Sequence, residues 1–244
     1  MEEKSLTVAF GDSLSDKSVD FISNLAEVGL DSIMEDGLLK EVPILSTVVS
    51  LFKIGGNIKD RHNLKKLIAF LNEINNEIPN QEEREKYKKK FQKSKHFRDA
   101  ELEYLLVIID RYIGYEKTQM LAHLYLAYLD KKIEWNSFAE YSEIVDRLLP
   151  SDFRCLFNFM CHGGVIIEKE KDINVASVLR LVSVGLVEQQ TGMTWTDLDN
   201  PKKKKEDFDY YITDFGKTFV KIFEKVLREE HIKNSTIIID SEQQ

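Results

Sequence analysis

Ser13 is the side chain of this chain whose setting best suits nucleophilic chemistry. It follows the apolar run Leu6–Phe10 and the pair Gly11-Asp12. A serine hydroxyl becomes a good nucleophile when a histidine within hydrogen-bond reach accepts its proton and a third group orients that histidine. The interpretation of Ser13 therefore depends on partner residues elsewhere in the sequence.

The block Leu6–Asp16 resembles the first motif of the GDSL, or SGNH, hydrolases. That resemblance implies a strand that presents Ser13 at a tight turn, a base in an Asp-x-x-His block near the C-terminus and an oxyanion donor in a Gly-x-Asn-Asp block. The nearest segments here are 228–231, Arg-Glu-Glu-His, with arginine in place of the aspartate, and 55–58, Gly-Gly-Asn-Ile, without the second acidic residue. Since neither partner is present, we predict that the chain is not an enzyme. A GDSL-type serine hydrolase remains as an alternative.

Metal and cofactor chemistry has no recognisable sequence pattern here. The five histidines lie on separate segments, and no His-x-x-x-His or Cys-x-x-Cys pair occurs. Cys155 and Cys161 are six positions apart, so on a helix they would face different ways and stay reduced. The glycine-rich phosphate loops of nucleotide-binding proteins are also absent. We therefore predict no catalytic residue, no metal and no cofactor.

Composition narrows the class of protein. The chain has 244 residues, 43% of them apolar, with only four prolines and eleven glycines, which favours a globular helical fold. The segment Met1–Lys4 lacks the basic start of a signal peptide and no long apolar run follows it, so we expect a cytoplasmic protein. A net charge of −8 argues against bulk attraction to nucleic acid or anionic lipid, although a local basic patch could still bind either.

The elements expected to position these residues are mostly helices. Apolar positions at helical spacing predict helices over 16–36, 60–78, 82–95, 100–113, 115–131, 137–150 and 152–162. Beyond Gly164 we predict strands at 165–167, 186–190 and 210–213, helices over 175–184 and 214–230, and an edge strand at 237–239. The fold class is therefore mainly α. We divide it into an N-terminal arm (1–15), a helical domain (16–135), a winged-helix-like α+β domain (136–231) and a tail (232–244).

Residues 42–52 form an uncharged run that is too short to cross a bilayer. A buried helix is one interpretation, and contact with a membrane or a partner protein is the other. The contact candidates in this run are Val42, Ile44, Leu45, Val48, Val49, Leu51 and Phe52.

The segments Val175–Glu188 and Tyr210–Lys217 resemble the second half of a winged-helix domain, a resemblance that extends over about residues 140–231. Gly185 would cap a recognition helix, Thr213 would cap the last helix, and residues 191–209 would form the wing. A lysine-rich wing could track DNA phosphates. The acidic residues that follow the lysines weaken the positive electrostatic potential of the wing. Winged helices also serve as protein-docking modules. The candidate DNA contacts are Lys202, Lys203, Lys204, Lys205 and Arg180.

The chain as a whole resembles bacterial proteins of the abortive-infection alpha type. The resemblance is carried by the uncharged Val-Pro-Ile segment and by the Gly-Leu-Val and Thr-Asp-Phe-Gly ending. It implies a part in phage defence and assigns no catalytic residue. We therefore expect a non-enzymatic interaction or regulatory protein that acts through protein contacts, self-association or peripheral membrane contact. A DNA-binding regulator is the main alternative.

Overall fold

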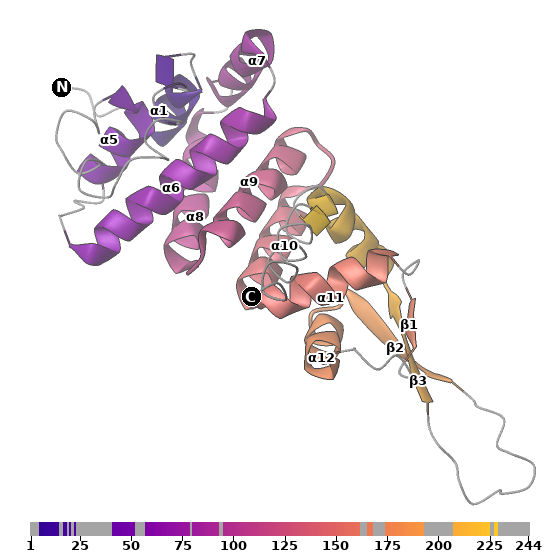
Figure 1. The fold of residues 1–244 in the computed structure, drawn as a ribbon. Helices are drawn as coiled ribbons and strands as arrows, with labels where there is room; N and C mark the ends of the chain where they lie inside the picture. Colours follow the sequence, from indigo (N-terminus) through magenta and orange to yellow (C-terminus); the bar gives the residue numbers. More distant parts are fainter. Residues whose placement is uncertain are drawn as a thin grey trace, which may run out of the picture. The chain divides into compact units, whose positions relative to one another are not determined.

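The structure, a computed structural model, is mainly α-helical (Figure 1). It describes residues 5–14, 17–18, 20, 22, 41–51, 57–78, 80–92, 95–161, 165–167, 174–192, 207–224 and 227–228. The chain divides into two compact units, Met1–Phe138 (unit 1) and Ala139–Gln244 (unit 2). The boundary falls inside helix α10 (Trp135–Arg147), close to the predicted boundary at residue 135.

Unit 1 is built from helices. The predicted helices over 60–78, 82–95, 100–113 and 115–131 are confirmed, and the helix predicted over 16–36 lies mostly outside the described residues. The helices of unit 1 that precede α10 are α1 (Leu6–Ser13), α5 (Pro43–Leu51), α6 (Ile58–Glu77), α7 (Gln81–Gln92), α8 (Lys95–Arg111) and α9 (Tyr115–Leu129).

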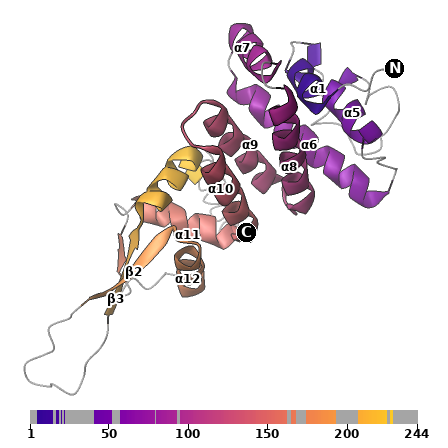
Figure 2. The same ribbon diagram turned by 180° about the vertical axis from the view of Figure 1, so that it is seen from behind.

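Helix α6 organises the core of unit 1. Asn57 caps its start, because the side chain accepts a hydrogen bond from the N–H of Asp60. Its apolar stripe, which includes Leu64, Leu71 and Ile74, is buried, and the helix packs against both α8 and α9 (Figures 1 and 2). Residues predicted from one helical stripe therefore face the centre of the unit.

Helix α1 replaces the predicted N-terminal arm. The described residues 5–14 form a helix that packs against α5, α7 and α8, so the separate arm over 1–15 is not observed. Phe10 is 2% exposed, and its ring lies 6.4 Å from Phe70 and 6.1 Å from Tyr125. Burial of this aromatic side chain stabilises the packing of α1 against the rest of unit 1.

Unit 2 combines helices with a small antiparallel sheet (Figure 2). Its three strands have the order β1-β3-β2, and the pairs Val165↔Tyr211 and Val187↔Ile212 set the register. The predicted helices over 137–150, 152–162 and 175–184 and the three predicted strands are confirmed. Residues 214–224 are helical, and the predicted edge strand at 237–239 lies outside the described residues. The elements after α10 are α11 (Pro150–Cys161), β1 (Val165–Ile167), α12 (Val175–Ser183), β2 (Val187–Gly192) and β3 (Asp207–Ile212).

Gly185 and Gly216 lie next to this sheet at positions where a larger residue would not fit the backbone. The sequence predicted such a role for Gly185. Gly185 has φ +75° just after α12, a left-handed conformation that glycine adopts without strain. A Cβ on Gly216 would lie 2.1 Å from the carbonyl oxygen of Leu186, so the last helix approaches β2 too closely for any side chain. The Thr213 hydroxyl accepts from the N–H of Gly216 at 2.9 Å and caps that helix, as predicted.

No helix among the described residues has both the length and the apolar character needed to cross a membrane.

Candidate interaction surface

Ser13 lies at the end of α1, where its hydroxyl is fully buried. Its Oγ donates to the carbonyl oxygen of Ala9 at 2.9 Å and accepts from the backbone N–H of Ile44 at 3.0 Å. The N–H of Ile44 is one of the donors left unpaired at the start of α5, so Ser13 caps a helix that is distant in sequence. The Gly-Asp-Ser motif is helical here rather than a strand followed by a turn, and Ser13 has a structural role. The prediction that the chain is not an enzyme stays a prediction.

The uncharged run forms α5 and packs against α1. Val42, Ile44, Leu45 and Val48 are each 5% exposed or less. These four side chains, named above as membrane or partner contacts, are instead part of the core of unit 1, because apolar groups on a short helix gain most by packing against a neighbour. Val49 is partly exposed, and the side chains of Leu51 and Phe52 lie outside the described residues.

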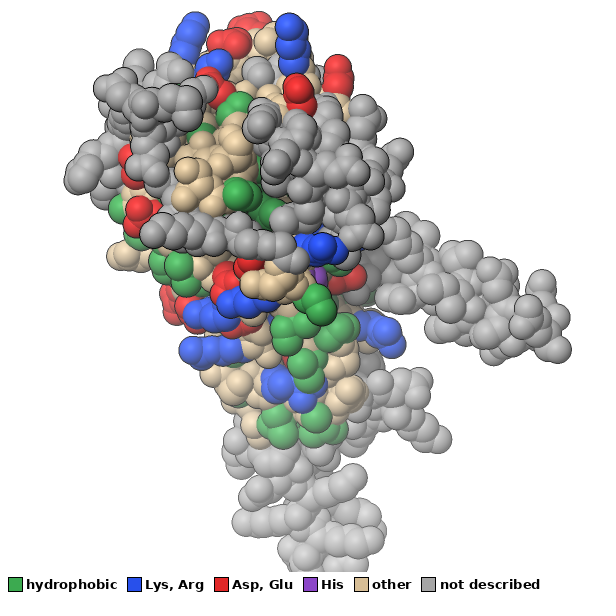
Figure 3. Space-filling model, turned by 90° about the vertical axis from the view of Figure 1, so that its left-hand side faces the viewer, with side chains coloured by type: hydrophobic (Ala, Val, Ile, Leu, Met, Phe, Trp, Pro, Cys, Tyr) green, Lys and Arg blue, Asp and Glu red, His purple; other side chains and the backbone are tan. Residues whose placement is uncertain are grey.

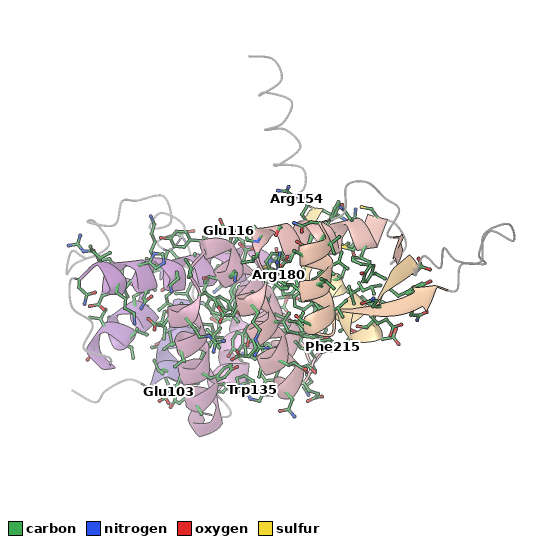
Figure 4. The ribbon with its side chains drawn as sticks, turned by 90° about the horizontal axis from the view of Figure 1, so that it is seen from below. Glu103, Glu116, Trp135, Arg154, Arg180 and Phe215 are labelled. Carbon is green, nitrogen blue, oxygen red and sulfur yellow. The ribbon has the colours of Figure 1, made fainter. Side chains whose placement is uncertain are left out.

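Arg180 on α12, labelled in Figure 4, is held by a buried carboxylate on α11. Its Nε donates to both oxygens of Asp152, at 3.0 and 2.9 Å, and its Nη2 donates to Oδ1 at 2.7 Å. Asp152 also accepts from the N–H of Leu149 at 2.8 Å. Burial raises the pKa of Asp152, but the hydrogen bonds from Arg180 and Leu149 outweigh it and hold the pKa below its usual value. That Arg180 contacts DNA stays a prediction, and two of its nitrogens are already hydrogen-bonded to Asp152.

Helix α12 leaves an apolar side uncovered. Ser177, Val178 and Leu181 are buried, whereas Val175 is 52% exposed and Leu179 is 49% exposed. Residues spaced by three and four positions share one side of a helix. We name this side the α12 face. It consists of Val175, Ala176, Leu179, Val182 and Ser183, and none of these residues is charged.

The four predicted lysine contacts fall between β2 and β3. The two strands pair as far as Gly192↔Asp207, so residues 193–206 connect two paired strand ends. The candidates Lys202, Lys203, Lys204 and Lys205 lie in this connection, outside the described residues. Their part in DNA binding stays a prediction.

Unit 1 contains a cavity of about 350 Å³ where α5, α6 and α8 meet. Its polar rim is paired internally, since Asp110 accepts from Lys59 at 3.2 Å and also from Asn63. Its apolar lining consists of Val48, Leu64, Leu67, Leu106, Val107 and Ile109.

Surface apolar groups are not confined to α12, and Figure 3 shows hydrophobic side chains reaching the surface beside lysines and arginines.

Other polar side chains of unit 1 have structural partners. Lys66 is 1% exposed, and its Nζ donates to the carbonyl oxygens of Asp110 at 3.0 Å and Tyr112 at 2.7 Å, near the end of α8. Burial lowers the pKa of this lysine. Glu101 is 2% exposed and accepts from Arg98 at 2.6 Å and from the Tyr128 hydroxyl. These groups tie helices together inside the unit.

The cysteines of α11 have different surroundings. Cys155 is buried and Cys161 is exposed, and both are free. Burial raises the pKa of the Cys155 thiol to about 11, so this thiol stays protonated and unreactive near neutral pH. His162, their neighbour in sequence, lies outside the described residues.

No protein-family model, curated protein or solved structure matches this chain. The function is therefore argued from its own residues.

The α12 face was not predicted from the sequence, although a signal for it exists. Six of the nine residues of Val175–Ser183 are apolar, and at helical spacing they extend over more than half of the circumference, with Ser177 and Arg180 on the remaining side. An amphipathic helix ordinarily buries its apolar stripe against one neighbouring part of the protein. The signal is thus an excess of apolar residues over what one packed side can cover, and only the structure shows which side remains open.

Proposed function

We propose that this chain is a non-enzymatic interaction protein whose unit 2 associates with a second copy of the chain through the α12 face. The observation that carries the proposal is the exposure of Val175 and Leu179 on one helix, next to a buried side of the same helix. Exposed apolar groups gathered at one place mark sites of protein contact more often than isolated ones do.

The order of elements supports a winged-helix-like domain for unit 2. Helices α10 and α11 precede β1, α12 precedes β2, and β3 lies between β1 and β2 in the sheet, an order that a winged-helix domain would also have, with the 193–206 connection as its wing. In such a domain α12 takes the place of the recognition helix. A recognition helix with an uncharged apolar side fits a protein surface better than it fits phosphates.

A second copy is the occupant that the charge distribution favours. Two chains of net charge −8 repel each other at a distance, but the α12 face carries no charge and can meet itself without an unpaired ion. A two-fold contact brings one patch against the same patch on the partner. Because a stable interface buries about 800 Å² per partner, five residues form only its apolar centre, and the association should be weak and concentration-dependent.

DNA binding is a second candidate function, favoured by the place of Lys202–Lys205 between the paired ends of β2 and β3. Two observations favour protein association over it. Arg180 pairs with Asp152, and the outward side of α12 offers no hydrogen-bond donor beyond the Ser183 hydroxyl. Phosphate contacts require positive charge or N–H donors.

A part in phage defence is the biological setting that the abortive-infection resemblance suggests. Association of two copies would then be the property that the defence depends on. In a phage challenge of cells that carry the chain, variants of the α12 face should lose whatever protection the native chain gives.

Sedimentation velocity over a wide range of concentrations tests the proposal directly. The native chain should show a sedimentation coefficient that rises with concentration, and the double variant Val175→Asp, Leu179→Asp should stay monomeric. Ile113→Asp is the matched control, because Ile113 is 87% exposed in unit 1 and should not take part. A native chain that is monomeric throughout, or a double variant that associates like the native chain, contradicts the proposal.

The DNA alternative has its own readout. Binding to a duplex that weakens with salt and disappears when Lys202–Lys205 become alanine would support the wing interpretation. Duplex binding that is absent, or that is unchanged by those substitutions, would remove it.

A further inference from the structure

Three side chains with metal-ligand chemistry meet where α6 packs against α9. Glu73 and Glu77 lie one turn apart on α6, so both carboxylates point to the same side of the helix. His123 lies on α9, fifty positions from Glu73 in the sequence. The potential ligand atoms of all three residues lie within 4.8 Å of one another. We propose that Glu73, Glu77 and His123 bind a divalent transition metal, with Zn²⁺ the best-suited ion.

The packing of α6 on α9 holds the three residues together. The two helices run side by side in both ribbon views (Figures 1 and 2). The His123 side chain is 9% exposed and that of Glu73 is 17% exposed. A partly buried position strengthens the attraction between ion and carboxylate relative to bulk water, and the remaining exposure gives the ion a path of entry.

The existing hydrogen bonds already orient the ligands. The Nε2 of His123 lies 3.0 Å from Oε1 of Glu73, and Gln119 donates to Oε2 of Glu73 at 3.2 Å. The first of these bonds joins two of the proposed ligands and is replaced when the ion binds, whereas the bond from Gln119 is an outer hydrogen bond of the kind that commonly fixes metal ligands. When the ion binds, the Nε2 proton must leave, either to the other ring nitrogen or to solvent, because a metal needs the free lone pair.

The donor set favours zinc. Zinc–ligand bonds of about 2.1 Å in a tetrahedral site place the ligand atoms about 3.4 Å apart, so small side-chain rotations from the present positions suffice. One imidazole and two carboxylates suit Zn²⁺, whereas Mg²⁺ and Ca²⁺ prefer oxygen ligands throughout. The two carboxylates balance the charge of the ion, and a water molecule would take the fourth position.

The simpler interpretation is a hydrogen bond that only joins two helices. That hydrogen bond joins His123 and Glu73, and the carboxylate of Glu77 is not one of its two partners. The variant Glu77→Gln keeps the length of the side chain and leaves the His123–Glu73 hydrogen bond in place. It therefore separates a metal site from a purely structural contact.

The test is titration of Zn²⁺ into the full chain after treatment with a chelator, followed by calorimetry. The native chain should bind one ion at this site, and Glu77→Gln and His123→Ala should each weaken that binding at least about tenfold. Glu116→Gln, an exposed carboxylate on α9 (Figure 4), and His62→Ala, a histidine on α6 that contacts Ile113 and Tyr115, are matched controls and should not change it. Zinc should also raise the melting temperature of the native chain and not that of Glu77→Gln.

Several results would overturn the site. One is Zn²⁺ binding of equal strength in the native chain, Glu77→Gln and His123→Ala, and another is the absence of saturable binding. A sulfur-to-cobalt charge-transfer band on Co²⁺ substitution would assign the ion to the cysteines instead. If circular dichroism shows His123→Ala to be unfolded, Glu77→Gln decides the question.

Discussion

The buried polar side chains of unit 1 contrast with the exposed apolar side chains of α12 in unit 2. In unit 1 the hydroxyl of Ser13, the ammonium of Lys66 and the carboxylate of Glu101 are buried and have partners inside the unit. In unit 2 the apolar side chains of Val175 and Leu179 lie at the surface. From residue type alone we would expect a chemically active site in unit 1 and a fully buried helix in unit 2. The comparison teaches that the partners a side chain finds, more than its type, decide whether it can act on other molecules.

The physical reason lies in what each group must satisfy. A polar group in a packed core has to be hydrogen-bonded, and once its donors and acceptors are used it has little left for a ligand. An apolar group at the surface has no such partner and gains free energy when another surface covers it. The burial and hydrogen bonds of Ser13, Lys66 and Glu101 are thus explained by the stability of unit 1, and the exposure of the α12 face of unit 2 is not.

The largest expected effect on stability is that of replacing Lys66, whose ammonium group is hydrogen-bonded inside unit 1. Replacing it with alanine empties a packed position and leaves the carbonyl oxygens of Asp110 and Tyr112 without this donor, so we expect a loss of about 3 kcal/mol in the free energy of unfolding. Chemical denaturation measures it. Lys59→Ala is the control, because that side chain is 71% exposed and its ion pair with Asp110 should contribute less than about 1 kcal/mol. Equal losses in both variants would break the comparison.

A smaller effect is expected for the ion pair of unit 2. Arg180→Ala leaves the buried Asp152 carboxylate without its main partner, and the melting temperature should fall by roughly 5 °C. Since the pKa of folded Asp152 is lowered, its contribution to stability is complete above the unfolded value near 4 and disappears as the pH falls through the folded pKa. The native chain should therefore lose stability in acid more steeply than Asp152→Asn. If the stability of the two proteins fell equally steeply with falling pH, the ionised Asp152 carboxylate would not stabilise the fold and this prediction would be contradicted.

The smallest effect separates a helix cap from a nucleophile. Ser13→Ala removes the acceptor for the N–H of Ile44 and should lower the stability by about 1 kcal/mol. Ser50→Ala changes an exposed serine on α5 and should have almost no effect. Loss of hydrolysis of a generic ester in Ser13→Ala, without loss of stability, would revive the hydrolase alternative.

The helices were predictable because their signals are local. The stripe through Leu64, Leu71 and Ile74 and the glycine at 185 follow rules that depend on a few neighbouring residues. The role of Ser13 was not predictable, since its partner Ile44 is thirty-one positions away. The same holds for the Asp152–Arg180 pair and for Glu73 with His123, which join separate helices. No spacing rule along one segment can find such pairs.

Cross-linking at the α12 face tests the central claim most directly. In a chain with Cys161→Ser, which removes the exposed native thiol, a cysteine introduced at Leu179 should form disulfide-linked dimers under mild oxidation, because a two-fold contact brings residues at its centre close to their own copies. Ile113→Cys in the same background gives the level expected from random collisions. Dimer formation well above that level for Leu179→Cys is the predicted result, and yields that are equal for the two variants would contradict the account.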